Sequence, residues 1–113
     1  MLVNLRCLYL GKNMIHSTFG LQALTNLETL DLADNMISTI TDLSKLPQLK
    51  TLNVSGNRLA TVDDLRDLAS CSQLQSLDMA SNRLEAPEVV DFVMGLPLLY
   101  LKLMGNPCVS NYR

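Results

Sequence analysis

Apolar residues recur in one fixed order along this chain. The stretch Leu27–Ile37, LETLDLADNMI, places three Leu, an Asn and an Ile in an order that LKTLNVSGNRL, Leu49–Leu59, repeats with only aliphatic exchanges. Alternate side chains of a strand point to opposite faces, so the centre of each stretch predicts a short strand with an apolar inner face. Five stretches share this order: Leu5, Leu8, Leu10, Asn13 and Ile15; Leu27, Leu30, Leu32, Asn35 and Ile37; Leu49, Leu52, Val54, Asn57 and Leu59; Leu74, Leu77, Met79, Asn82 and Leu84; Leu98, Leu101, Leu103, Asn106 and Cys108.

This order is the L-x-x-L-x-L-x-x-N-x-L signature of leucine-rich repeats, which recur every 20 to 29 residues or so. One copy cannot bury its own Leu side chains, so neighbouring copies must stack and share a core. The expected fold is an α/β solenoid, an arc with a parallel sheet on the concave face and short helices or turns on the convex face. We expect a single domain over 1–113 with repeats at about 5–26, 27–48, 49–73, 74–97 and 98–113, within a longer protein.

The Asn of each repeat follows the predicted strand, where the chain must turn and leaves backbone groups that the sheet cannot pair. A carboxamide carries both donors and an acceptor, so a column of Asn is expected to bridge the turns of adjacent repeats. The alternative is the ordinary preference of Asn for turns. The column would consist of Asn13, Asn35, Asn57, Asn82 and Asn106.

The segments between the strands predict short helices on the convex side. Thr39 and Asp42, like Thr61 and Asp64, have the spacing of a capping box at a helix start. Pro87 suits the first position of a longer helix in the fourth repeat, because its missing N–H has no helical partner to lose. The extra residues of the third and fourth repeats are therefore expected to lengthen the helices and not the strands.

Composition narrows the class of protein further. The 113 residues are 48% hydrophobic but only 4% aromatic, so the core must be aliphatic. The net charge of −2 and nine scattered Lys and Arg residues give no basic stripe for nucleic acid, and no apolar run is typical of a membrane span. The three cysteines, Cys7, Cys71 and Cys108, are odd in number and far apart, which favours a reduced intracellular protein.

Catalytic chemistry is absent from the pattern. The single His16 is expected in a surface turn, and Asp63, Asp64 and Asp67 are expected to stabilise a helix start and not to bind a cation. The sequence contains neither a Gly-rich phosphate loop nor a zinc-like cysteine spacing. We therefore expect no enzyme activity and no catalytic, cofactor-binding or metal-binding residues.

The residues between the inward Leu side chains are expected to line the concave face and to bind a protein partner. This face is small and mildly acidic, with Tyr9 and Tyr100 as aromatic anchors; plain solvent-exposed strand residues are the alternative. Asp31 and Asp78 lie outside the inward Leu set, so substituting either is expected to cost only about half a kcal/mol. The predicted protein-binding residues are Tyr9, Thr29, Asp31, Thr51, Asn53, Ser76, Asp78, Tyr100 and Lys102.

Three motifs narrow the resemblance within leucine-rich repeat proteins. The spacing of Ile37, Ile40 and Leu43 is similar to that of the intracellular subclass named after a phosphatase regulatory subunit. From Leu49 onward the chain resembles the dynein axonemal assembly factor 1 family. The shared features are VDDL in the third repeat, NRLEAPEV at the start of the fourth, and LKLMGNP before the final NYR, Asn111–Arg113.

That resemblance implies a protein-binding scaffold for cytoplasmic pre-assembly of axonemal dynein arms in motile cilia and flagella. It implies axonemal dynein chains, chaperones or other assembly factors as partners, a monomeric state, and a cytoplasmic location with ciliary or flagellar association. A leucine-rich dynein light chain on the axoneme and a regulatory subunit of a protein phosphatase remain as alternatives. Because the concave face has few aromatic residues, the sequence argues against the phosphatase regulatory subunit.

Overall fold

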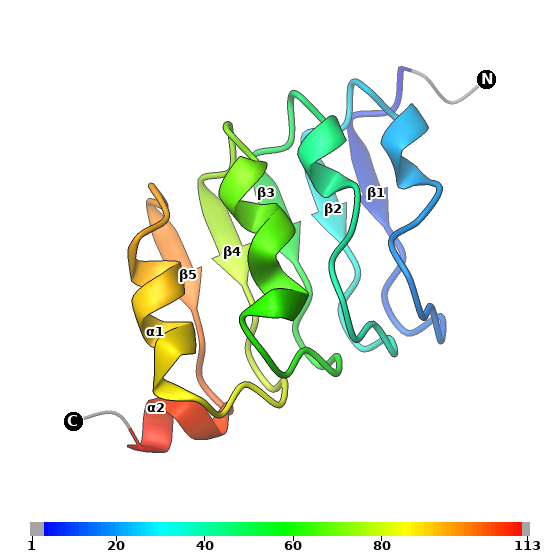
Figure 1. The fold of residues 1–113 in the computed structure, drawn as a ribbon. Coiled ribbons are helices and arrows are strands. Elements are labelled where there is room, and N and C mark those ends of the chain that lie inside the picture. The colour runs from blue at the N-terminus through cyan, green and yellow to red at the C-terminus, as the bar shows by residue number, and fades with distance from the viewer. Residues whose placement is uncertain (1–3, 112–113) are drawn as a thin grey trace.

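The computed structural model describes residues 4–111 of the protein, and their side chains as far as Val109. Tyr112 and Arg113, which end the NYR motif, lie outside the described residues. Five parallel strands pair in chain order and form one sheet, with the helical segments on one side of it (Figure 1). This arrangement confirms the predicted repeat solenoid. The strands are β1 (Cys7–Tyr9), β2 (Thr29–Asp31), β3 (Thr51–Asn53), β4 (Ser76–Asp78) and β5 (Tyr100–Lys102).

The segments that return from one strand to the next differ in length, as predicted. The first two contain the three-residue 3₁₀ helices η1 (Leu21–Ala23) and η2 (Leu43–Lys45). The next two contain the eight-residue η3 (Asp63–Ser70), also 3₁₀, and the eight-residue α-helix α1 (Pro87–Met94). A short helix, α2 (Pro107–Asn111), follows β5. Each strand keeps three residues, so the longer repeats extend the helical side alone.

The core consists of stacked layers of aliphatic side chains. In the second repeat Leu27, Leu30, Leu32 and Ile37 are fully buried, and equivalent residues of the third and fourth repeats are buried as well. Burying one Leu side chain stabilises a fold by roughly 1.5–3 kcal/mol. Cys108 is buried at the last apolar position of the fifth repeat, where the other repeats have Ile or Leu.

The predicted Asn column is present and joins adjacent repeats. Asn57 accepts a hydrogen bond at Oδ1 from the N–H of Ile37, at 2.9 Å. Its Nδ2 donates to the carbonyls of Leu32 at 2.9 Å, Val54 at 3.0 Å and Ser55 at 3.1 Å. One carboxamide therefore pairs backbone groups of its own turn and of the preceding turn, the kind of bridge that the sequence predicts.

The same bonding pattern extends along the column. Asn35, Asn82 and Asn106 are also buried, and each pairs with backbone of its own and the preceding repeat. Asn13 begins the column, is exposed, and donates to the carbonyl of Gly11. Each turn is thus stabilised by the Asn of the repeat that follows it in the chain.

A left-handed residue stands directly before every Asn of the column. Its φ is 60° at Lys12, 57° at Asp34, 67° at Gly56, 57° at Ser81 and 80° at Gly105. A second constraint favours glycine at position 56, because a Cβ there would collide with the carboxylate of Asp34 in the preceding repeat. The tight turn therefore needs both an unusual backbone and, at this position, the absence of a side chain.

Only one of the two predicted capping boxes forms. Asp64 Oδ2 accepts from the N–H of Thr61 at 3.0 Å, and Thr61 Oγ1 accepts from the N–H of Asp64 at 3.4 Å. Thr39 instead donates its hydroxyl to Asp64 Oδ1 at 3.0 Å, while Asp42 is left-handed and pairs with Lys45. The expectation was wrong for Thr39 and Asp42 because the left-handed Asp42 precedes a helix of only three residues.

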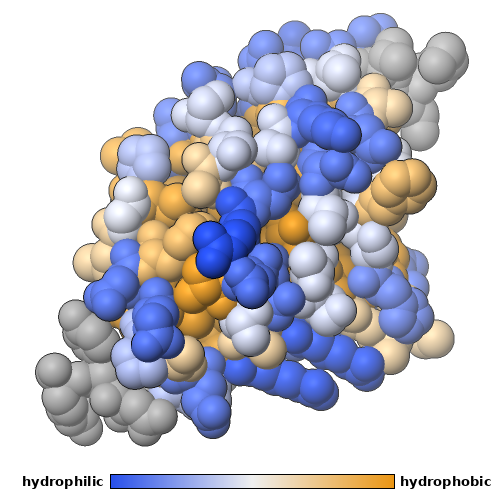
Figure 2. Space-filling view, in the orientation of Figure 1, coloured by the Kyte–Doolittle hydropathy of each residue, from blue (hydrophilic) through white to orange (hydrophobic). Residues whose placement is uncertain are grey.

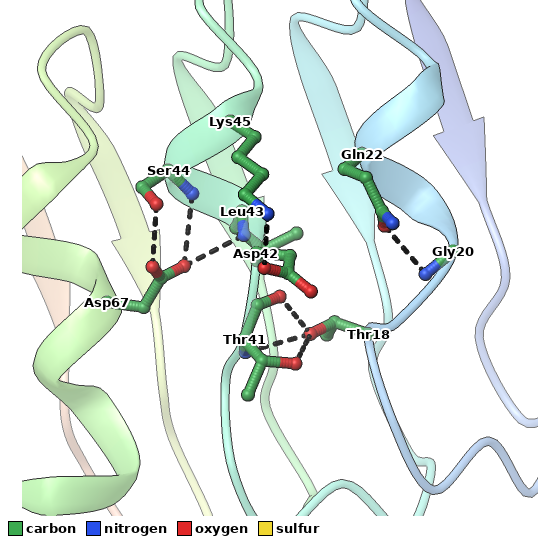
Figure 3. A network of polar contacts seen from close by, with 9 residues as sticks. All are labelled: Thr18, Gly20, Gln22, Thr41, Asp42, Leu43, Ser44, Lys45 and Asp67. Atoms are coloured by element: carbon green, nitrogen blue, oxygen red, sulfur yellow. Dashed lines mark hydrogen bonds and ion pairs between the residues drawn. The ribbon is translucent and has the colours of Figure 1, made fainter.

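The missing cap on η2 comes from the next repeat. Asp67 Oδ2 accepts from the N–H groups of Leu43 at 2.8 Å and Ser44 at 3.0 Å, and Oδ1 accepts from the Ser44 hydroxyl (Figure 3). Another contact between repeats joins the fully buried Thr18, whose hydroxyl donates to the carbonyl of Thr41 at 2.6 Å. Polar bonds therefore join the helical side of the stack as the Asn column joins the turns.

We expect Asn57→Ala to destabilise the protein by about 1–3 kcal/mol, because it removes the acceptor of the buried Ile37 N–H and the donor to three carbonyls. The free energy of unfolding from denaturant titration measures this loss. Asn13→Ala is the matched control, since its exposed side chain supports only its own turn, and it should stay within about 0.5 kcal/mol of wild type. Equal midpoints for Asn57→Ala and wild type would show that the column adds no stability.

Gly56→Ala should cost about 1–3 kcal/mol, since it forces a non-glycine residue into a left-handed turn and places its Cβ against Asp34. Gly20→Ala isolates the backbone contribution, because Gly20 has φ of 98° and nothing within 4 Å of a Cβ. Thermal unfolding should therefore show the larger loss for Gly56→Ala. Similar losses for both variants would mean that Asp34 moves aside without cost.

Candidate protein-binding surface

Strand register gathers all nine predicted binding residues on the open face of the sheet, called here the concave surface. One row contains Thr29, Thr51, Ser76 and Tyr100, each paired in register with the next. The row beside it contains Tyr9, Asp31, Asn53, Asp78 and Lys102. The helical segments lie on the opposite side, and Figure 2 shows that helical face as a mixture of hydrophilic and hydrophobic residues.

The concave surface is shallow, with its largest side chains on the outer strands. Tyr9 is 67% exposed on β1 and Tyr100 is 55% exposed on β5. Between them a hollow of about 200 Å³ lies over β3 and β4, with Thr51, Ser76 and Asp78 in its lining and Tyr100 at its side. The short Thr and Ser side chains thus leave space for one side chain of a partner.

Asp31, Asn53 and Asp78 also have a structural role that the sequence reasoning missed. Their Oδ1 atoms accept hydrogen bonds from the backbone N–H two residues on, at 2.9, 3.0 and 3.0 Å respectively. These are Asx turns, which an Asp or Asn at a strand end favours. The expected cost of about half a kcal/mol for substituting either Asp stays a prediction for Asn, which keeps an acceptor; a substitution such as Asp31→Arg also removes this hydrogen bond.

Asn53 shows which substitution keeps the turn. An amide oxygen accepts the same bond as a carboxylate, so Asp31→Asn and Asp78→Asn remove charge and retain the acceptor. These two changes separate the surface charge from the stability of the turn.

The three acidic residues near η3 act separately. Asp63 is exposed and pairs with Arg66, Asp64 belongs to the capping box, and Asp67 caps η2 of the preceding repeat. In residues 4–111 no group of three or more His, Cys, Asp or Glu is placed to hold a metal ion. Stabilisation of helix starts, the predicted role, therefore holds for Asp64 on its own helix and for Asp67 on its neighbour's.

The histidine and the three cysteines do not assemble a reactive site. His16 is exposed, as predicted for a surface turn. Cys7, Cys71 and Cys108 are all free thiols. Burial raises the pKa of Cys71 to about 12, with a further contribution from the charge of Asp67, and burial also raises the pKa of Cys108. Both buried thiols are therefore protonated core residues, while Cys7 is exposed at the edge of the concave surface.

The repeats match a family model described as Leucine Rich repeats (2 copies) over residues 3–47, 25–67 and 47–89. The chain belongs to the leucine-rich repeat family. Proteins built from stacked repeats use the extended concave surface to bind partners, so this chain is a protein-binding scaffold by class. Among residues 4–111, no helix has the length and apolar character needed to cross a membrane.

One curated relative narrows the comparison. The chain is 49% identical over 47 residues to Leucine-rich repeat-containing protein ODA7 of Chlamydomonas reinhardtii. The match covers 41% of this chain and 11% of ODA7, so it spans a small part of that relative. The similarity agrees with the family resemblance that the repeat motifs indicate.

Solved structures share the fold. An internalin of Listeria monocytogenes, InlF, has a TM-score of 0.80 and 33% identity over 92% of this chain and 30% of that protein. The ectodomain of the Arabidopsis thaliana receptor kinase GASSHO1/SCHENGEN3 has a TM-score of 0.66 and 27% identity over 91% of this chain and 13% of its own. Internalin C2 of the same Listeria species has a TM-score of 0.59 and 25% identity, and it is covered over 54% of its length.

We expect the capping box of Asp64 to make stability depend on pH. Partial burial raises the pKa of Asp64, but hydrogen bonds from Thr61, Ala60 and Thr39 together lower it below the ordinary 3.8. A lowered pKa in the folded state adds stability above the unfolded value, and this contribution is lost as pH falls through the folded pKa.

The difference in free energy of unfolding between wild type and Asp64→Asn should therefore be constant above about pH 5 and shrink as pH falls below about 3.8. Denaturant titrations across this range measure it. Asp63→Asn is the control, because its exposed carboxylate pairs with Arg66 and not with the turn. A difference that does not change with pH would contradict the assignment.

Proposed function

We propose that this chain is the partner-binding part of a scaffold for cytoplasmic pre-assembly of axonemal dynein arms in motile cilia and flagella. Its partners are axonemal dynein chains, chaperones or other assembly factors, and it acts as a monomer. The observation that carries the proposal is the 47-residue match to ODA7 at 49% identity. The motifs VDDL, NRLEAPEV and LKLMGNP, which resemble those of the dynein axonemal assembly factor 1 family, support the same proposal.

The structure supports a binding role for the concave surface on physical grounds. None of its nine side chains belongs to the core, which the inward Leu layers form. Two exposed tyrosines flank a floor of short residues, and tyrosine is enriched among the residues that dominate binding energy at interfaces. The surface is also uninterrupted from β1 to β5, since all five strands pair in register.

Copurification distinguishes this proposal from its two rivals. Tagged protein containing this chain, recovered from the cytoplasmic extract of ciliated cells, should bring down dynein heavy chains and chaperones. Recovery mainly with isolated axonemes would favour a leucine-rich dynein light chain. Recovery with a phosphatase catalytic subunit would favour a phosphatase regulator.

Loss of the concave charges should abolish the cellular function while the fold persists. In cells lacking the endogenous protein, the full-length protein with Asp31→Asn and Asp78→Asn should express normally yet fail to restore dynein arms, counted in axonemal cross-sections. Asp63→Asn with Asp91→Asn removes the same charge from exposed positions on the helical face and should restore them. Restoration by both variants, or by neither, would contradict binding through these carboxylates.

A further inference from the structure

The concave surface presents carboxylates whose positions are fixed before any partner arrives. Asp31 and Asp78 each use Oδ1 to accept a backbone N–H at 2.9 and 3.0 Å. Among the described residues, no hydrogen bond or ion pair to the second oxygen of either side chain is found. A partner that binds these oxygens therefore orders no further rotamer of Asp31 or Asp78, which reduces the entropic cost of association.

The spacing of these carboxylates is set by the sheet. Asp31 pairs in register with Asn53, and Asn53 pairs with Asp78. Adjacent strands lie about 4.8 Å apart, so the two Asp are separated by about 10 Å, with a neutral amide between them. Two carboxylates this far apart cannot ligate one metal ion, but they can pair with two separate cations.

An apolar recess lies beside this row. The hollow over β3 and β4 is lined by residues of both strands, with Tyr100 of β5 at its side: Thr51, Leu52, Asn53, Ser76, Leu77 and Asp78. It therefore adjoins Asp78 and extends toward β5, while Asp31 lies one strand beyond it. An aliphatic or aromatic side chain would cover the exposed ring of Tyr100 here.

The row that contains Asp31, Asn53 and Asp78 ends on β5 with the positively charged Lys102. It pairs in register with Asp78. The ion pairs found in residues 4–111 join Lys45 with Asp42 and Arg66 with Asp63, so Lys102 and Asp78 are not in direct ion-pair contact. The order of charge from β2 to β5 is negative, neutral, negative and positive, which gives the surface a direction.

We infer that the concave surface takes an amphipathic helix of another protein that lies across the strands. The helix carries two basic side chains seven residues apart, which pair with Asp31 and Asp78. Between them, nearer to the base that pairs with Asp78, it carries an aliphatic or aromatic side chain that fills the hollow beside Tyr100. This inference rests on the proposed function only in that the concave surface binds a protein.

Helix geometry matches these positions. Residues seven apart on a helix lie on one face and are separated by about 10 Å, the distance between the two carboxylates. A residue four positions after the first base lies on the same face. An acidic residue one turn beyond the second base would face Lys102 and set the direction of the helix.

Synthetic helical peptides test the inference with the purified chain. The probe carries two Arg seven residues apart with a Leu between them, on a neutral Ala and Gln background. One control peptide replaces both Arg with Glu, and another places the two Arg only three residues apart. Fluorescence anisotropy should show binding of the probe, weaker binding of the closely spaced peptide, and no binding of the Glu peptide.

Variants of the chain locate the site. Asp31→Asn with Asp78→Asn should weaken probe binding about tenfold and reduce its salt dependence, since both exposed ion pairs with the probe are lost. Asp63→Asn with Asp91→Asn should leave affinity unchanged. Tyr100→Ser should weaken the Leu peptide but not a peptide with Ala in place of Leu.

The inference would be overturned if the probe fails to bind, if the Glu peptide binds equally well, or if both double variants bind like wild type. These outcomes are distinct from failure of the proposed function. Peptide binding that follows the expected order, without copurification of dynein chains, would contradict the dynein role and leave the helix site standing. Copurification of dynein chains, together with peptide binding that does not depend on Arg spacing or charge, would contradict the helix site and leave the dynein role standing.

Discussion

The bond from each buried Asn carboxamide to the turn of the preceding repeat is the interaction on which the rest of the structure depends. A left-handed residue follows three positions after the end of every strand. In the turn beyond it, the N–H of the last apolar consensus residue finds its acceptor in the Asn of the next repeat. Asn57 meets this need for the second repeat with bonds of 2.9 Å to Leu32 and Ile37. Because an unpaired buried polar group is costly, each repeat is stable only when its successor is stacked in register.

Fixed register has a direct effect on the concave surface. A strand that slipped by one residue would turn its Leu side chains outward and its polar side chains into the core. The column of Asn prevents this slip at the end of every strand, so Asp31, Asn53 and Asp78 must lie side by side. The positions of side chains on the concave surface therefore depend on the hydrogen bonds of the Asn column, which lies beyond the strand ends.

The sequence predicted the features that recur with the repeat, and it missed the contacts between repeats that occur at one place only. The alternation within each strand gave the buried Leu set, and the phase of Asn gave the column. The cap that Asp67 places on Leu43 and Ser44 was missed, because capping rules consider positions three or four residues apart while these partners are 23 and 24 apart. The failure of the Thr39–Asp42 box has the same origin, since Thr39 bonds to Asp64 of the next repeat.

The row of Asx turns separates what the fold needs from what it does not. Each turn requires one oxygen acceptor, and Asn53 supplies it without a charge at the same 3.0 Å distance as Asp78. A neutral amide therefore forms the same turn, so the turn does not require the negative charges of Asp31 and Asp78. The strand of Asn53 separates these two charges, which lessens their mutual repulsion. A charge that the turn does not require, held at a fixed spacing on an open surface, supports the proposal that the concave surface binds a basic partner.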